Sequence, residues 1–251
     1  NLEMYDYNFL NLGYVSYSPS IYYKKIEQMI KKKKISFEKI FLFIDHSDIQ
    51  DEAQFYREDK YGNIVRKWMS DTEVKSKNRK YKVKNYLKQN SFIFKLYENI
   101  SAPTISNDTK KCFKSGDDLN FRKYLDSNRF GYSYINDIQN QNWVDDGINK
   151  ILFYLDKIKA LSVEYKFEII IINYPSALEV IDSISSENSK HHNFLRDWSL
   201  KNKVNFVNVR NDFIKKENIS DYLNNFITCD VHWNGNGHRI ISDNLKTIIN
   251  E

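Results

Sequence analysis

The chain has 251 residues, 41% of them hydrophobic and 28% charged, a composition typical of a globular protein with one substantial core. No run of eighteen apolar residues occurs, so the sequence contains no candidate membrane-spanning helix. The formal net charge of +5 is uneven, because residues 57–95 hold twelve Lys and Arg residues against four Asp and Glu. This basic block suits nucleic acid, lipid headgroups or an acidic glycan, or it is a solvated helical insertion. No nucleic-acid motif accompanies it, and we expect no nucleic-acid partner.

Hydrophobic spacing predicts strands and helices in alternation. The expected elements are, in chain order, a strand over 7–12, a helix through Tyr22, Ile26, Met29 and Ile30 that ends in the solvent-facing lysines 31–34, a strand over 39–45, an irregular insertion over about 52–140 with one helix near 80–99, a helix over 143–161, a strand over 167–173, a helix through Phe194, Leu195 and Trp198, a strand over 205–209, and a last helix that starts at 234–237. Strands that alternate with helices predict an α/β fold: a parallel sheet with helices on both faces.

Polar loops follow several of the expected strands. Residues 13–19 follow the first strand, 45–51 the second and 173–175 the third. The loop that contains Asp230 and His232 precedes the last helix. Ligands of open α/β sheets bind beyond the carboxyl ends of the strands, so we expect these loops to meet at one rim.

Asp230 stands two residues before His232 in Asp-Val-His-Trp-Asn-Gly-Asn-Gly-His, residues 230–238. In an extended or turn segment, residues i and i+2 point the same way, so the Asp230 carboxylate can reach the His232 ring. A carboxylate that accepts the Nδ1 proton of a histidine leaves Nε2 free to act as a general base. The pair therefore predicts two members of a catalytic triad.

The order of these motifs resembles the SGNH (GDSL-like) hydrolase and acyltransferase superfamily. Residues 11–19 (Asn-Leu-Gly-Tyr-Val-Ser-Tyr-Ser-Pro) look like its second block, and residues 43–49 occupy the place of its third block, Gly-x-Asn-Asp. Residues 230–238 look like its last block, in the Asp-x-His-Trp form of bacterial cell-surface polysaccharide acetyltransferases. The resemblance implies a single domain over 1–251 with a three-layer, flavodoxin-like parallel sheet, interrupted by a largely helical insertion over about 52–140.

The resemblance also assigns roles to residues. The oxyanion donors of the second and third blocks fall on Ser16 and Ser47, in place of a glycine and an asparagine. Trp233 is expected beside the site, where it shapes the pocket, and Asp48 is expected to brace its loop as a cap or turn acceptor. The first block, Gly-Asp-Ser, does not occur in the chain. We expect the nucleophilic serine, with its strand, on a segment upstream of Asn1.

The function that the resemblance implies is acyl transfer through a serine ester. His232 would take the serine proton and Asp230 would steady the imidazolium. The expected substrates are an acyl donor and a carbohydrate acceptor, most simply an acetyl group and a bacterial envelope glycan, in the periplasm or cell envelope. No cofactor is expected; a membrane-associated partner or an N-terminal anchor would lie outside this chain. The alternative is a catalytically silent glycan-binding or scaffold protein with the same fold.

Other chemical residues receive structural interpretations. Asp45, Asp48 and Asp51 have a spacing that Ca²⁺ ligands can have, but the glycine and spacing of an EF-hand are missing, so we expect no metal site. His191 and His192 are adjacent, which predicts a surface pair because neighbours on a helix do not face each other. His238 is expected in the first turn of the last helix. Cys112 and Cys229 show no metal-ligand spacing.

Overall fold

The computed structural model describes residues 8–14, 16–67, 140–182, 186–214, 219–227 and 231–249. Its main sheet contains β1 (Lys39–Phe43), β4 (Glu168–Asn173) and β5 (Asn205–Asn208), hydrogen-bonded in the order β1-β4-β5. Both pairings are parallel; Phe43 lies opposite Ile172, and Asn173 opposite Asn208. The protein is therefore a mixed α/β protein with a parallel three-stranded sheet, as the alternation of strands and helices predicted.

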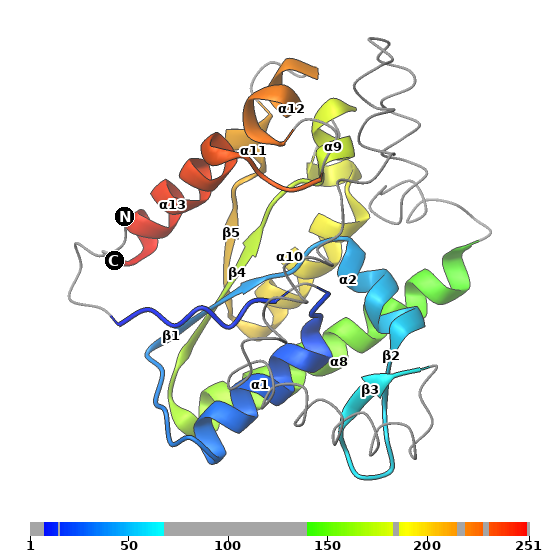
Figure 1. Ribbon diagram of the computed structural model, residues 1–251, viewed down its shortest axis with the longest axis vertical. Coiled ribbons are helices and arrows are strands. Elements are labelled where there is room, and N and C mark those ends of the chain that lie inside the picture. Colours follow the sequence, from blue (N-terminus) through cyan, green and yellow to red (C-terminus); the bar gives the residue numbers. More distant parts are fainter. Residues whose placement is uncertain are drawn as a thin grey trace, which may run out of the picture.

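Two hydrophobic cores cover the two faces of the sheet (Figure 1). On one face, Ile169 and Ile171 of β4 pack with α1 (Pro19–Lys31), α8 (Gln141–Tyr165) and α10 (Lys190–Asn202). On the other face, Ile170 and Ile172 pack with α9, α11, α12 and α13. Because β4 is covered on both faces, it is a continuous run of isoleucines rather than an alternating strand.

The helices of the second core are mostly short. They are α9 (Ala177–Ile181), α11 (Arg210–Phe213), α12 (Ile219–Asn225) and α13 (Gly235–Ile249), and a 3₁₀ turn, η4 (Ser186–Asn188), precedes α10. The start of α13 confirms the helix expected from 234–237, and α8 confirms the helix expected over 143–161. None of the helices within the described ranges is long and apolar enough to cross a bilayer.

The strand expected over 7–12 is wrong for residues 8–12, which form neither strand nor helix. Phe9 and Leu10 leave about half of their surface exposed, at 47% and 53%, so their apolar character does not reflect burial in the sheet. The Gly13 amide bonds instead to the Asn11 side chain at 2.9 Å, which is a local turn rather than a ladder contact.

The insertion begins differently from the largely helical segment that was expected. After α2 (Ser47–Gln50) come a π-helical turn, η2 (Asp51–Phe55), and an antiparallel hairpin of β2 (Tyr56–Glu58) and β3 (Ile64–Arg66). Gly62, at φ +77°, supplies the turn of this hairpin. The helix expected near 80–99 and Cys112 lie outside the described residues.

Candidate functional site

The loop before α13 reaches the carboxyl ends of the sheet strands. The ring of Trp233 lies edge-on to Tyr174, just after β4, with 4.6 Å between ring centroids. The same ring lies 6.5 Å from that of Phe43, the last residue of β1. Residues 231–238 of the motif are therefore placed at the rim where the polar loops were expected to meet.

Backbone contacts pin this loop to the end of α12. Ile227 N–H donates to the carbonyl of His232 at 2.9 Å, beside a bridge between Phe226 and Trp233. The Asn234 side chain donates to the Phe226 carbonyl at 3.0 Å and accepts from the Gly237 amide at 3.2 Å, which caps α13. The loop is held at both ends, so its position at the rim is set by the backbone.

The side chains of the loop divide between solvent and core. His232 is exposed, whereas Trp233 is half-buried against the strand ends. His238 lies in the first turn of α13, as expected, and is also exposed. Asp230 and Cys229 lie outside the described residues, so the contact expected between Asp230 and His232 stays a prediction.

The loop after β1 is organised around Asp45. Its Oδ1 atom accepts hydrogen bonds from both the amide and the hydroxyl of Ser47, each at 2.6 Å. Its Oδ2 atom accepts from the Tyr174 hydroxyl at 3.5 Å. Burial raises the pKa of Asp45, but His46, these Ser47 bonds and His191 outweigh it and lower the pKa below its usual value. Asp45 is therefore an anion that uses one oxygen to hold its own loop and the other to contact Tyr174 after β4.

Asp48 braces the same loop, as the sequence led us to expect. Its carboxyl accepts from the Asp45 amide at 3.2 Å and from the Tyr22 hydroxyl at 3.4 Å. The side chain is buried, and burial together with the nearby Asp45 and Asp51 raises its pKa well above the usual range. The protonated form of Asp48 is therefore favoured.

Ser16 lies in the loop before α1, which contacts the same region. Its backbone has φ +58°, in the left-handed region that glycine adopts without steric cost. Tyr56 donates its hydroxyl to the Ser16 carbonyl. The Tyr22 hydroxyl lies within hydrogen-bond distance of the carbonyls of Tyr17 and Phe43, at 3.0 and 3.3 Å. The loops of Ser16 and Ser47 are thus tied to one strand end.

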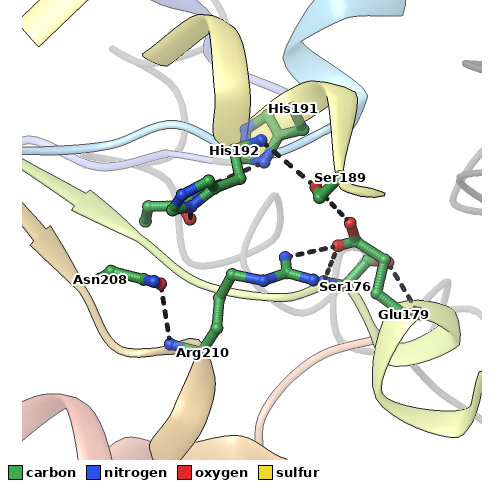
Figure 2. Close-up of polar contacts among 8 residues, drawn as sticks. Ser176, Glu179, Ser189, His191, His192, Asn208 and Arg210 are labelled. Carbon is green, nitrogen blue, oxygen red and sulfur yellow. Dashed lines mark hydrogen bonds and ion pairs between the residues drawn. The ribbon is translucent and has the colours of Figure 1, made fainter. Parts of the chain in front are cut away.

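Behind these loops, two buried histidines share one amide (Figure 2). Asn173 Oδ1 lies 2.8 Å from His192 Nδ1, and Asn173 Nδ2 lies 3.4 Å from His191 Nδ1. Both rings are buried, with exposed fractions of 2% and 4%, so the surface pair expected from the sequence is wrong. The expectation failed because both residues lie in the first turn of α10, above the end of β4, where two successive side chains can reach Asn173.

A buried ion pair lies next to the histidines (Figure 2). Arg210 Nη1 lies 3.2 Å from Glu179 Oε2, and both side chains are at most 3% exposed. Ser189 donates to Glu179 Oε1 at 2.6 Å, and the Ser176 amide donates to Oε2 at 2.8 Å. Burial raises the pKa of Glu179, but the charges of Arg210 and His191 and these bonds outweigh it and bring the pKa to about 2.

Sequence reasoning missed this buried network. One signal was present: Ser176 and Glu179 have the Ser-x-x-Glu spacing of a capping box, which they form at the start of α9. No spacing pointed to Asn173, whose role depends on the register of β4 against α10. Tyr22 and Tyr174 were expected only as a helix residue and a strand end, yet their hydroxyls contact Asp48 and Asp45.

Within the described ranges, no group of three or more His, Cys, Asp or Glu side chains is arranged to hold a metal ion. Asp45, Asp48 and Asp51 are therefore not gathered around a common point as cation ligands. Comparison of the chain with protein-family models, curated proteins and solved structures found no match.

Proposed function

We propose that this protein is a serine-dependent acyltransferase or esterase with a flavodoxin-like SGNH architecture, acting on a carbohydrate. The observation that carries the proposal is the packing of Trp233 against Tyr174 and Phe43. That packing puts the loop of His232 at the carboxyl edge of a parallel sheet, where α/β enzymes bind ligands. The loops of Ser16 and Ser47 converge on the same strand ends.

The proposed reaction proceeds in two half-reactions. A serine oxygen attacks the acyl carbon of the donor while His232 Nε2 takes the serine proton, and Asp230 holds the Nδ1 proton. When the tetrahedral intermediate collapses, the leaving group takes the proton from His232 and the acyl group stays on the serine as an ester. A sugar hydroxyl, or water, then gives its proton to His232 and attacks the ester carbonyl. When this second intermediate collapses, His232 returns the proton to the serine oxygen, and the acylated sugar, or the free acid, is released.

The edge of β1 that faces away from β4 supports a place for the serine. Among the described residues, β1 hydrogen-bonds to β4 on one side only. A further parallel strand on its other side would end at the same rim as Asp45 and Trp233. We place the nucleophile at the end of such a strand, within reach of His232.

Of the two expected oxyanion donors, Ser16 is favoured. The hydroxyl and the amide of Ser47 both donate to Asp45, so the geometry directs them away from a substrate. The Ser16 amide belongs to a loop in the left-handed conformation next to the end of β1. A backbone N–H is a standard oxyanion donor because its direction is fixed by the fold.

The acceptor is proposed to be a sugar, in a bacterial envelope glycan. The adjacent rings of Trp233 and Tyr174 at the rim are both half-buried, so each keeps part of its surface exposed. Such rings offer apolar surface against which the apolar face of a sugar can pack. Acetyl is the simplest acyl group, and the periplasm or cell envelope is the proposed location.

Labelling with a fluorophosphonate serine probe tests the proposal. We expect the native full-length protein to be labelled on one serine and His232→Ala to lose the labelling. His238→Ala, a second exposed histidine near the same loop, is the matched control and should be labelled like the wild type. Peptide mapping would then identify the serine. Equal labelling of wild type and His232→Ala would overturn the proposed role of His232.

A catalytically silent glycan-binding protein is the second candidate. The specific observation in its favour is the engagement of Ser47 with Asp45, which removes one of the two expected oxyanion donors. Glycan binding by a folded, full-length protein that is not labelled and does not turn over esters would establish it in place of the enzyme.

A further inference from the structure

Each of the three helices that lead into the sheet strands is followed directly by a lysine. α1 precedes β1, α8 precedes β4 and α10 precedes β5; because these strands are parallel, the three helices end at one edge of the sheet, the amino-terminal edge (Figure 1). We call the exposed lysines of this edge the lysine edge: Lys31, Lys32, Lys33, Lys34, Lys166, Lys201 and Lys203. Within the described part of the chain, only Lys31 of this set forms an ion pair, at 3.1 Å from Glu27.

Three of these lysines have an unusual backbone conformation. Lys34, Lys166 and Lys203 have φ values of +57°, +57° and +51°. The amide after each of the last two lysines closes a helix end. The Phe167 amide donates to the Ser162 carbonyl at 3.1 Å, and the Val204 amide donates to the Ser199 carbonyl at 2.9 Å. Glycine is the usual residue at such a position because a side chain there is sterically unfavourable. The chain carries a cation at each position where glycine would give a more stable helix end.

Large apolar side chains are exposed among the lysines. Val163 and Tyr165 in the last turn of α8 are 68% and 38% exposed, and Leu200 in the last turn of α10 is 71% exposed. A groove of about 530 Å³ runs between the two helices, and Val163 and Lys201 are among the residues that line it. The helix dipole favours lysines at helix ends, but it gives no reason to expose a valine and a leucine there.

We propose that the lysine edge is a docking surface for an anionic lipid bilayer. Lysine ammonium groups attract phosphate headgroups, and the apolar side chains of Val163 and Leu200 can enter the boundary between headgroups and acyl chains. A nucleic acid or a soluble polyanion would use the lysines and leave these two side chains in water. The inference is independent of the proposed chemistry, and it would turn the candidate site, at the opposite edge of the sheet, away from the membrane.

The left-handed lysines provide a variant that should not damage the fold. Lys166→Gly/Lys203→Gly removes two cations and relieves two strained positions, so the melting temperature should stay the same or rise. Its partition coefficient onto anionic vesicles should fall about 25-fold, because each lysine near an anionic membrane surface strengthens binding about fivefold. If these two lysines made no contact with the membrane, the variant would bind vesicles as the wild type does.

The test is cosedimentation of the full chain with sucrose-loaded vesicles. Vesicles of phosphatidylcholine alone are compared with vesicles that contain about 30 mol % phosphatidylglycerol, at about 0.1 M salt. We expect binding to the anionic vesicles only. The charge-matched control is Lys190→Gln/Arg239→Gln, within the first two turns of α10 and α13, and it should bind like the wild type. Val163→Ser/Leu200→Ser should weaken vesicle binding but leave binding to heparin unchanged.

Several results would overturn the proposal. Absence of binding, or equal binding to both vesicle compositions, would exclude an anionic-lipid surface. Strong vesicle binding that Lys166→Gly/Lys203→Gly does not reduce would assign the interaction to other lysines of the chain. Heparin binding that is lost in that variant, together with vesicle binding indifferent to Val163→Ser/Leu200→Ser, would make the edge a site for soluble polyanions.

Discussion

The hydroxyl of Ser47 donates a 2.6 Å hydrogen bond to Asp45 Oδ1, which directs its only proton into the loop that follows β1. A serine hydroxyl has one proton, so it cannot serve Asp45 and an oxyanion at the same time. The resemblance placed an oxyanion donor at this position. The contact with Asp45 instead gives Ser47 a structural role, in which it holds the loop between β1 and α2.

Ser47→Ala should therefore affect stability more than chemistry. We expect the free energy of unfolding to fall by about 1–3 kcal/mol, because a hydrogen bond to a charged acceptor is lost. Ester turnover should fall less than about tenfold, whereas loss of a true oxyanion donor lowers kcat about 10²–10³-fold. Urea denaturation and steady-state kinetics measure the two effects. A hundredfold loss of kcat with unchanged stability would restore Ser47 to the oxyanion site.

Asp48 should behave as a neutral side chain. Burial and the carboxylates of Asp45 and Asp51 raise the pKa of Asp48. Its contribution to the free energy of unfolding is therefore full at low pH and is lost as the pH rises from the ordinary pKa of an aspartate toward the raised one. Asp48→Asn keeps an acceptor for Tyr22 and removes this dependence, so it should be at least as stable as the wild type at pH 7. Asp48→Ala removes the acceptor and should cost about 1–3 kcal/mol. Denaturant titrations at about pH 5 and pH 7 compare them; a strongly destabilised Asp48→Asn would mean that the ionised form is needed.

The sequence predicted the three strands of the main sheet and the four longest of the described helices, α1, α8, α10 and α13, because those elements have strong periodicity. The run of isoleucines in β4 and the apolar stripe of α8 leave few alternatives for a buried strand and an amphipathic helix. Residues 8–12 were misassigned because Phe9 and Leu10 are apolar without being buried, and only the tertiary structure reveals that. Hydrophobic periodicity predicts burial well when many residues of a segment fit one pattern. It predicts burial poorly when a short segment contains only two apolar residues.

The candidate site was predictable only in part, for a related reason. The loop of Trp233 could be placed because it precedes the last helix and because parallel strands end at one edge. The contacts of Asn173 with His191 and His192 depend on which turn of α10 lies above the end of β4. That register is set by packing between segments that are distant along the chain. Sequence spacing carries no information about it.

His191 should make the protein sensitive to moderate acid. Burial lowers its pKa to about 4, whereas the unfolded chain binds that proton near pH 6.5. Between these values the unfolded state holds more protons, so the free energy of unfolding falls as pH decreases from about 6.5 to about 4. At pH 5 the loss from this residue should be about 2 kcal/mol. The charged and titratable groups that face His191 are Asp45, His46, Glu179 and Arg210.

His191→Gln isolates this effect, because it removes the titrating ring and leaves its neighbours in place. We expect the free energy of unfolding of the variant to fall less between pH 7 and pH 5 than that of the wild type, by about 2 kcal/mol. The slope with pH is the readout, so a uniform change in stability does not obscure it. Parallel curves for wild type and His191→Gln would show that folding does not change the pKa of His191.

Gly237 should be required for the position of the Trp233 loop. A Cβ atom added at Gly237 would overlap the Asn225 carbonyl oxygen and lie 2.8 Å from Trp233 Cβ, which is too close for any real contact. Gly237→Ala must therefore displace the loop that carries His232, at a cost of about 1–3 kcal/mol. Because catalytic groups must hold their geometry closely, ester turnover should fall about 10²-fold even where the variant is folded.

Gly235→Ala, two residues earlier, is the matched control, since an added Cβ there meets nothing within 4 Å. Alanine is a better helix former than glycine, so this variant should be as stable as the wild type or slightly more stable. It should also keep wild-type ester turnover. The pair therefore separates a close approach of the backbone from a general demand for glycine at the start of α13. Equal effects of the two substitutions on turnover would mean that the loop needs flexibility, and the packing of Gly237 against Trp233 would no longer explain its position.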